Sequence, residues 1–403
     1  MINKWLSVIG IGEDGLSGLS AKAYTLVQNA SVIVGGKRHL EMLPSDDPRE
    51  KIIWTSPISE SIKEILKHRG QSVCVLASGD PMCFGIGVTL KREIPITEMT
   101  VIPASSSFSL ACAILGWSLT DVETLSLNAR PPALLQAFIY PGARIIILSE
   151  GKETPGIVAE LLTKRGFGKS KITVLERMGG HQQRIIEAVA DCWEITDVGE
   201  LNTIAVECVA DGVVLGLSRL AGLPDEAYHH DGQLTKKEIR AVTLAALAPT
   251  PGQLLWDVGA GCGSIGIEWM RSHSRCRAIA IEQHSSRIQY IIDNATALGT
   301  PNLEIIQGKA PTALKHLPQP DAIFIGGGAT AEGLFDVCWQ ALKPGGRFVA
   351  NAVTVESEQK LLQWHSKNNG ELIRLAVQRA EPIGGFLGWK AMSPITQWIG
   401  IKK

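Results

Sequence analysis

The stretch WDVGAGCGSIG at residues 256–266 constrains the fold more than any other part of the chain. Its glycines stand between an apolar run that ends at Trp256 and a second run, 265–270, that has a helical pattern. Glycines at this density permit positive φ and remove the Cβ atoms that would keep a ligand away from the backbone. A strand, a glycine loop and a helix in this order are typical of a ligand site over the carboxyl ends of parallel strands.

The first half of the chain alternates short apolar runs with amphipathic ones, which indicates an α/β fold. Amphipathic runs such as 59–70 and 156–166 end in glycine, as helices commonly do. The alternation predicts a largely parallel sheet covered by helices. Strands rich in Val and Ile are expected at residues 5–11, 30–35, 72–78, 99–104, 143–149, 171–177 and 202–210.

The alternation stops at 211–233, where Gly, Pro and Asp cluster, and then resumes. Thr235 is expected to cap a helix over 235–247, with Glu238 completing a capping box. We therefore predict a domain at 1–210, a linker at 211–225 and a doubly wound domain at 226–403 with a seven-stranded, mostly parallel sheet. Its strands are expected at residues 253–259, 277–283, 303–309, 321–327, 346–353, 371–380 and 395–403.

Composition excludes several classes of protein. A net charge of −1 argues against broad binding of nucleic acid, which needs a basic face. No apolar run reaches the roughly 18–20 residues that span a bilayer, and the start lacks the apolar core of a signal peptide, so the cytoplasm is the expected compartment. The 8 cysteines include no C-x-x-C pair and mostly occupy apolar segments, which predicts buried free thiols and no metal site.

Two classes of ligand-binding domain are consistent with the glycine loop. The letters GCGSIG at 261–266 match G-x-G-x-x-G, so a dinucleotide-binding domain is one alternative. Glu282, at the next strand end, can accept both hydroxyls of a ribose, and Asp257 can orient the loop or bind a ligand ammonium. The Pro-Gly-Gly turn in QALKPGGRFVA at 340–350 favours another class of protein. So does the pair of strands expected after DAIFIGGGA, where a dinucleotide-binding domain would have its second nucleotide-binding half.

These features resemble class I S-adenosylmethionine-dependent methyltransferases over 226–403. The segments GLPDEAYHHDGQLTKKEIRAVTL, IIQGKAPTAL and DAIFIGGGA are similar to the small methyltransferase of corrin biosynthesis that methylates C15 and decarboxylates the C12 acetate side chain. That resemblance implies that the loop holds the methionine part of the cofactor, Glu282 the ribose and Ala310 the adenine, with a contribution from Thr235. The implied loop residues are Gly259, Ala260, Gly261, Cys262 (through its backbone) and Gly263.

A second set of motifs lies in the first half: VIGIGEDG at 8–15, GGKRHLE at 35–41, ASGDPMCFG at 77–85 and IPASSSFSLACAILG at 102–116. They resemble the tetrapyrrole methylase family, whose fold has two α/β halves with the cofactor between them, and GGKRHLE is similar to the branch that methylates C5. Glu13-Asp14 replaces part of the family's Gly-Pro-Gly, and Ala104 stands where glycine is common. The residues implied to approach this second cofactor are Gly10, Asp80, Cys83, Ser106 and Ser107.

The two resemblances together imply an enzyme that transfers methyl groups from S-adenosylmethionine, bound once in each domain, to a small-molecule tetrapyrrole. Aligning the methyl donor and acceptor supplies most of the rate, which agrees with the lack of a triad or metal cluster in the sequence. Self-association is expected because both families commonly form oligomers. A nicotinamide-dependent reductase, a non-catalytic tetrapyrrole-binding protein and a cobalt-carrying substrate remain alternatives. Candidates to pair with substrate carboxylates are Lys37, Arg38, His39, His229, His230, Lys236 and Arg240.

Overall fold

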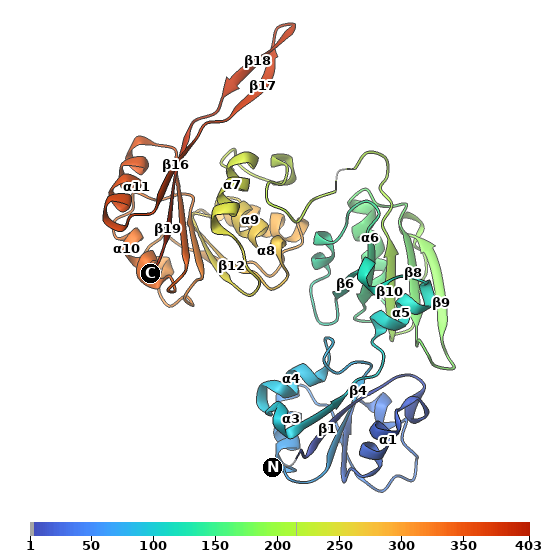
Figure 1. Ribbon diagram of the computed structural model, residues 1–403. Coiled ribbons are helices and arrows are strands. Elements are labelled where there is room, and N and C mark those ends of the chain that lie inside the picture. The colour runs from blue at the N-terminus through green and yellow to red at the C-terminus, as the bar shows by residue number, and fades with distance from the viewer. Residues whose placement is uncertain (1–3, 215) are drawn as a thin grey trace. The chain divides into compact units, whose positions relative to one another are not determined.

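A computed structural model describes residues 4–214 and 216–403, and these form two compact units (Figure 1). Residues 4–132 and 141–214 belong to the first unit, and residues 133–140 and 216–403 to the second. The short segment 133–140 lies with the second unit, where the Arg219 guanidinium stacks 4.3 Å from the centre of the Phe138 ring. The domain limits 1–210 and 226–403 remain a prediction.

The first unit contains two five-stranded sheets, which confirms the expected pair of α/β halves. The first sheet is entirely parallel and has the order β3-β2-β4-β1-β5. Helices precede or follow most of its strands: α1 (Ala21–Gln28), α2 (Lys37–Leu40), α3 (Ile58–Lys67) and α4 (Ile86–Glu93). The strands are β1 (Leu6–Ile11), β2 (Val32–Gly35), β3 (Glu50–Ile53), β4 (Val73–Ser78) and β5 (Met99–Ile102).

The second sheet of this unit differs from the parallel sheet that the sequence predicts. Its order is β6-β7-β10-β8-β9, and only the pair β6–β7 is parallel. The cause is local: β8 and β9 follow each other directly as a hairpin, and β10 pairs antiparallel with both β7 and β8. The elements are β6 (Glu123–Ser126), β7 (Arg144–Leu148), β8 (Lys171–Glu176), β9 (Arg184–Val189) and β10 (Asn202–Glu207), with α5 (Ser107–Leu115) and α6 (Thr154–Lys164).

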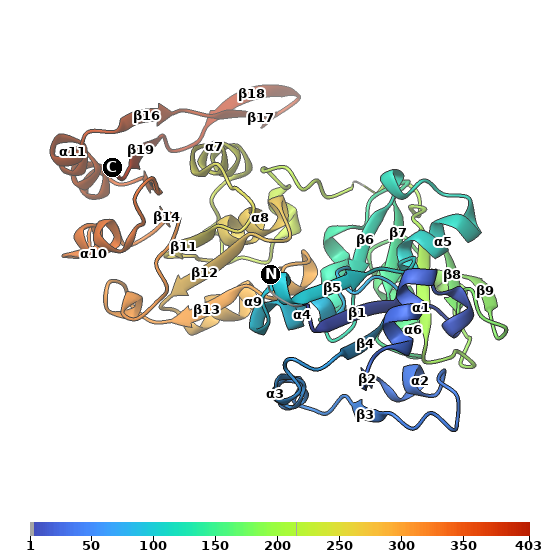
Figure 2. The ribbon, with the colours of Figure 1, turned by 60° about the horizontal axis from the view of Figure 1, so that its bottom comes forward.

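The second unit is built on a seven-stranded sheet of order β13-β12-β11-β14-β15-β19-β16, and Figure 2 shows β13, β12 and β11 side by side. β19 runs opposite to the other six strands of this sheet, so the predicted mostly parallel sheet is confirmed. Its strands are β11 (Leu254–Val258), β12 (Arg277–Glu282), β13 (Glu304–Gln307), β14 (Ala322–Ile325), β15 (Arg347–Ala352), β16 (Glu371–Leu375) and β19 (Ile395–Ile401). Its helices are α7 (Lys237–Leu247), α8 (Ser264–Ser272), α9 (Ser285–Ala297), α10 (Leu334–Ala341) and α11 (Val355–Asn368).

Side-chain alternation along β11 explains how the sheet is covered on both faces. Leu255 packs into one apolar cluster with residues of α8 and α9, whereas Trp256 packs into another with residues of α10 and α11. Because successive side chains of a strand point to opposite faces, Asp257 lies on the α8 side. Both faces are therefore buried, as the continuous apolar character of the strand predicts.

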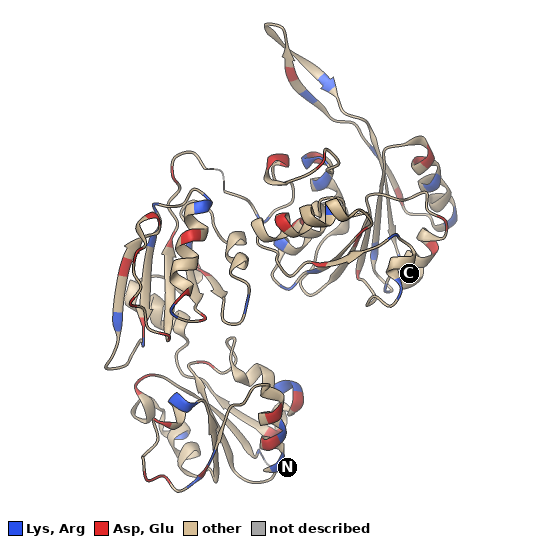
Figure 3. Cartoon of the chain, turned by 180° about the vertical axis from the view of Figure 1, so that it is seen from behind, with Lys and Arg blue, Asp and Glu red and all other residues tan. Residues whose placement is uncertain are grey.

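A hairpin of β17 (Gln378–Ile383) and β18 (Phe386–Ala391) projects from the second unit as an arm (Figures 1 and 2). Residues 371–380 are expected to form one strand, but they are divided between the end strand β16 and the hairpin strand β17. Along α11 the acidic residues come first, with Glu356 and Glu358 in the first turn, and the lysines Lys360 and Lys367 follow (Figure 3). In the part of the chain that the structure describes, the helices are too short or too polar to cross a membrane.

Candidate cofactor and substrate sites

A cavity of about 970 Å³ lies at the carboxyl ends of the parallel strands of the second unit. Loops after β11, β12, β13 and β14 form its walls, together with residues 232–236, which precede α7. Val353 and Thr354, which follow β15, and Met392 and Ser393, which connect the hairpin to β19, also line the cavity. The strand order reverses between β11 and β14, and this is where open α/β sheets bind their ligands.

The glycine loop after β11 has the backbone that its sequence predicts. Gly259, Gly261 and Gly263 have φ of +71°, +61° and +82°. A Cβ on Gly259 would lie 2.9 Å from backbone atoms of Gly327, in the loop after β14. The two loops therefore approach each other only because a side chain is absent at this point, and at Gly259 and Gly327 the cavity is lined by backbone.

Glu282 is buried at the end of β12 and lines the cavity. Its Oε2 accepts a hydrogen bond from the Gly261 N–H at 2.9 Å, and its Oε1 accepts from the N–H groups of Gln283 and His284, both at 2.9 Å. A carboxylate offers about four lone-pair positions, so these three bonds leave one position unfilled. Glu282 thus fixes the glycine loop and keeps an acceptor for a ligand hydroxyl.

Asp257 is fully buried and lies behind the loop, outside the cavity lining. Its Oδ2 accepts from the Gly266 N–H at 2.9 Å, in the first turn of α8, and its Oδ1 has no partner among the described residues. Burial, and more weakly the charge of Glu282, raises the pKa of this carboxyl to about 7. This geometry suits the loop-orienting role; a direct bond from Asp257 to a cofactor remains a prediction.

The other predicted residues of this unit, Thr235, Ala260, Cys262 and Ala310, line the cavity. Burial raises the pKa of the Cys262 thiol to about 11, and its carbonyl accepts from Asn294 at 3.0 Å, so its backbone is held in place. The prediction that Thr235 caps α7 is wrong. The N-cap is Lys236, which makes no side-chain cap bond, and Asp225 accepts from the Lys237 N–H instead.

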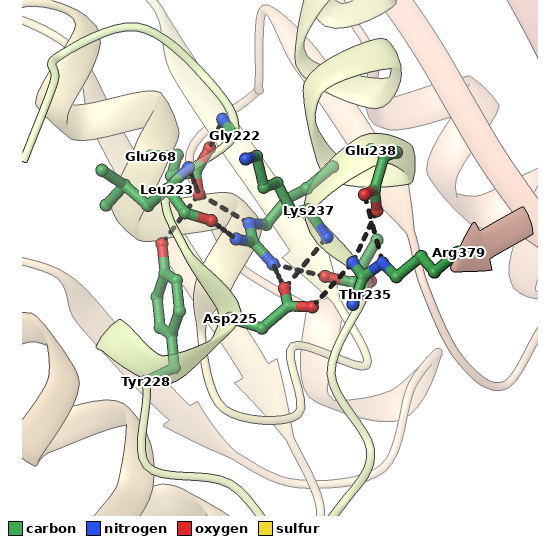
Figure 4. A network of polar contacts seen from close by, with 10 residues as sticks. Gly222, Leu223, Asp225, Tyr228, Thr235, Lys237, Glu238, Glu268 and Arg379 are labelled. Atoms are coloured by element: carbon green, nitrogen blue, oxygen red, sulfur yellow. Dashed lines mark hydrogen bonds and ion pairs between the residues drawn. The ribbon is translucent and has the colours of Figure 1, made fainter. Parts of the chain in front are cut away.

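Arg240, expected to meet a substrate carboxylate, is instead the centre of a buried network (Figure 4). Its side chain is fully buried and donates to Glu268 at 2.6 Å, to Asp225 at 3.0 Å and to the carbonyls of Thr235 and Leu223. That expectation is wrong, because protein acceptors surround the guanidinium. Arg240 instead holds the segment before α7, whose residues 232–236 line the cavity.

Lys236, His229 and His230, the other candidates of the second unit for pairing with substrate carboxylates, differ in their positions. Lys236 lines the cavity, so its expected role as a carboxylate partner remains a prediction. His230 Nδ1 accepts from the Gly232 N–H at 2.9 Å, and His229 is exposed beside it.

In the first unit the predicted residues gather where β1, β4 and β5 end. A Cβ on Gly10 would lie 2.0 Å from the Gly79 carbonyl oxygen and 2.4 Å from the Ala104 nitrogen, so glycine is required there. Asp80 accepts from the Met82 N–H at 2.8 Å and shapes its own turn. Ser106 caps α5, and Cys83 packs beside Phe108.

A small cavity of about 60 Å³ lies in the first unit and has walls from both of its sheets. Ser107 lines it, whereas Gly10, Asp80, Cys83 and Ser106 lie outside its lining. Contact of these five residues with a cofactor therefore remains a prediction.

The altered loop Glu13-Asp14-Gly15 is well packed. Room for the Asp14 carboxylate comes from Gly12 and Gly18, where a Cβ would lie 2.6 Å and 1.9 Å from its oxygens. The Glu13 carboxylate forms ion pairs with Arg38 and, at 3.7 Å, with Arg177. The loop thus has specific partners of its own in place of the family's glycine-proline turn.

The cavities also have lining residues that are not among the predicted site residues. Gly326, Gly327 and Gly328 follow β14, and the letters GGGA were a usable signal, since glycines after a strand allow close backbone approach. No local signal pointed to Arg177 or Met392, because only the tertiary fold brings them to the cavities.

Two family models match the chain, one in each half. Residues 6–191 match "Tetrapyrrole (Corrin/Porphyrin) Methylases", and residues 226–402 match "Precorrin methyltransferase domain". Together with the fold and the strand-end cavity, these matches define a protein with two methyltransferase units that act on tetrapyrroles.

Relatives that align with nearly the whole chain identify the family within this class of methyltransferases. The chain is 48% identical over 398 residues to a precorrin-6Y C(5,15)-methyltransferase [decarboxylating] of Sinorhizobium sp, with 99% of this chain and 96% of that protein covered. It is 43% identical to the protein of the same name from Mycobacterium tuberculosis, with 98% and 99% covered. The crystal structure of the C-terminal domain of precorrin-6Y C5,15-methyltransferase from Rhodobacter capsulatus is 48% identical, with a TM-score of 0.44, and covers 46% of this chain and 100% of its own. The chain belongs to the family of decarboxylating precorrin-6Y C5,15-methyltransferases.

Proposed function

We propose that this protein methylates precorrin-6Y at C5 and C15 and removes the carboxyl group of its C12 acetate side chain, which yields precorrin-8. The observation that carries the proposal is the glycine cradle with Glu282 at the switch point, on a chain that is similar along its whole length to enzymes of that name. Both of those enzymes are named for a precorrin and not for a cobalt-precorrin, which favours the metal-free substrate.

We assign C5 methylation to residues 1–210 and C15 methylation with decarboxylation to residues 226–403, each with its own site for S-adenosylmethionine. The two family matches, at 6–191 and 226–402, support this division. We also propose that the protein self-associates and acts in the cytoplasm. Light scattering coupled to gel filtration tests the first of these, and a mass equal to one chain would contradict it.

The residues of the second unit fit such a donor. S-adenosylmethionine supplies a methyl group already activated on a sulfonium. Glu282 would accept a ribose hydroxyl at the lone-pair position that its three backbone bonds leave free, the backbone of 259–263 would hold the methionine part, and Ala310 would lie at the adenine. The bare backbone at Gly259 removes the steric obstacle to that approach.

What the chain contributes to the reaction is mainly alignment. Methyl transfer needs the acceptor carbon, the methyl carbon and the leaving sulfur in line, and holding them so supplies most of the rate. The macrocycle itself takes up the electron pair released when the acetate side chain loses CO₂, so the protein needs only to orient that side chain.

Incubation of the purified protein with precorrin-6Y and methyl-labelled S-adenosylmethionine tests the proposal. The product mass should show two methyl groups gained and one CO₂ lost, and NMR of the labelled carbons should place the methyl groups on C5 and C15. Consumption of NADPH without methyl transfer would indicate a reductase and contradict the proposal. Calorimetric titration with S-adenosylhomocysteine should show two binding events per chain, and a single event would contradict a site in each unit.

A further inference from the structure

Two arginines of the first unit share one carboxylate. Arg38 belongs to α2, Arg177 follows β8 in the other sheet, and Glu13 lies in the loop after β1 and pairs with both. The Glu13 side chain is 11% exposed, whereas those of Arg38 and Arg177 are 31% and 46% exposed. One negative charge faces two positive charges, so the cluster retains a positive charge that is open to solvent.

The chain around Arg177 is shaped for this cluster. Arg177 has a φ of +44°, a left-handed conformation that residues with a Cβ adopt only at a cost in free energy. Three residues later Gly180 leaves room for Glu13, since a Cβ there would lie 2.7 Å from the Glu13 Cβ. A strained backbone of this kind persists where the surrounding structure fixes it, and such sites are often functional.

The electrostatics around Arg38 agree with an unbalanced positive charge. Burial, and next the charge of Arg177, lowers the pKa of the Arg38 guanidinium. Its neighbour His39 is uncharged near neutral pH, because burial and then Arg38 lower its pKa to about 4. Lys37, in contrast, points to solvent and pairs with Glu41 at 3.9 Å.

The cluster borders the small cavity between the two sheets of the first unit. Hydrogen-bonding side chains line it, among them Ser78 of β4, Ser107 of α5 and Thr203 of β10. Arg38 donates to Ser78 Oγ at 2.8 Å. Its volume of about 60 Å³ suits the end of a side chain and not a macrocycle. Paired guanidinium groups match the geometry and charge of a carboxylate better than any other side chain does.

We propose that Arg38 and Arg177 form a binding subsite for one carboxylate side chain of the substrate, and that Glu13 occupies this subsite until the substrate replaces it. The inference rests on the proposed function, which supplies a substrate rich in carboxylates. It also gives the altered first loop a role: Glu13 neutralises the arginines in the free enzyme and makes binding an exchange of one carboxylate for another.

The test uses the full chain, because C15 methylation on the same polypeptide is an internal control. Arg38→Gln and Arg177→Gln should each raise the KM for C5 methylation about ten-fold, with little change in kcat, since each removes one charge-assisted bond. Arg177→Lys should recover part of the loss, because lysine keeps the charge without the planar fork. C15 methylation should be unchanged in all three variants.

Glu13→Gln separates a subsite from a structural ion pair. Removal of the competing carboxylate should lower the KM for C5 methylation several-fold, whereas loss of a purely structural partner would leave that KM unchanged or raise it. Arg184→Gln is the matched control, since Arg184 lies in the same unit, has 43% of its side chain exposed and pairs with Glu176. Circular dichroism and titration with S-adenosylhomocysteine check that each variant is folded.

The outcomes are distinct. If the wild-type protein transfers no methyl group to precorrin-6Y, the proposed function itself is overturned. If the wild type methylates C5 and both arginine variants keep its KM, or Glu13→Gln leaves the KM unchanged or raises it, the carboxylate subsite is overturned and the proposed function stands.

Discussion

Gly259 shows how one missing Cβ defines a ligand site. Its φ of +71° disfavours any larger residue, and a Cβ at this position would lie only 2.9 Å from the backbone of Gly327. Gly252 has a similar φ of +92°, but a Cβ there would meet nothing within 4 Å. Substitutions at the two glycines therefore distinguish the free energy cost of positive-φ strain from the cost of the steric contact.

We expect Gly259→Ala to destabilise the second unit by about 2–4 kcal/mol, the sum of positive-φ strain and overpacking. Gly252→Ala should cost about 1 kcal/mol, from strain alone. Urea unfolding measures both values, and calorimetry should show that only Gly259→Ala weakens S-adenosylhomocysteine binding. Equal effects of the two substitutions would contradict a role for the close loop approach.

Because of Asp257, the free energy of unfolding should depend on pH between about 4 and about 7. Burial raises its pKa to about 7, from an ordinary value of 3.8, so between these values the folded state holds a proton that the unfolded state has lost. Stability contributed by this group is therefore present below about pH 4 and is lost as the pH rises to about 7. Asp257→Asn cannot ionise, and its stability relative to the wild type should increase over this window by on the order of 4 kcal/mol.

Unfolding curves at several pH values measure the difference between Asp257→Asn and the wild type. Other titrating groups are common to both proteins and cancel in that difference. Asp336→Asn, at a carboxylate with a 60% exposed side chain, should show no comparable trend. A difference between Asp257→Asn and wild type that stays flat from pH 4 to pH 7 would show that the buried carboxyl ionises normally.

Among the elements, α7 and α8 are joined through polar contacts as well as apolar ones. Glu268 on α8 accepts from Arg240 on α7, from the Tyr228 hydroxyl at 2.9 Å and from the N–H groups of Gly222 and Leu223 (Figure 4). Arg379, on the hairpin strand β17, reaches the same network through Asp225 and Glu238. The hairpin is thereby tied to the segment that forms one wall of the cavity.

Replacement of Arg240 by methionine leaves Glu268 buried without its cation and takes from Asp225 one of its two cations, the other being Arg379. Loss of one partner of a buried ion pair typically costs about 3–5 kcal/mol. We expect Arg240→Met to destabilise the second unit by this amount and to speed hydrogen exchange in α7. Arg374→Met, at an arginine with a 57% exposed side chain that pairs with Glu358, should cost less than about 1 kcal/mol. Similar losses from both variants would contradict the central position of Arg240.

Among the secondary-structure elements, strands rich in Val and Ile were predictable from the sequence. β1, β4, β11 and β12 lie within the expected ranges. β3, β6 and β9 were not predictable, because strands with charged or exposed residues lack a clear apolar period. The role of Arg240 was not predictable either. Its partners Asp225 and Glu268 are 15 and 28 positions away, and only the packing of α7 on α8 brings them together.

For the whole molecule, the proposed assignment of one cofactor site to each unit predicts that the two reactions can be lost separately. Glu282 accepts three backbone N–H groups and lines only the cavity of the second unit. Glu282→Gln removes the charge that these bonds require and places an amide N–H₂ among donors. We expect C15 methylation and decarboxylation to fall on the order of 100-fold, from the loss of charge-assisted bonds to the loop and to the ribose.

C5 methylation by Glu282→Gln should stay at the wild-type rate, and calorimetry should retain one of two S-adenosylhomocysteine binding events. Glu304→Gln, at an exposed glutamate on the neighbouring strand β13, is the matched control and should keep both events. Labelled methyl groups located by NMR distinguish the two reactions in a single incubation. Loss of C5 methylation along with C15 methylation would show that the units depend on each other, and the assignment of one independent site to each would then fail.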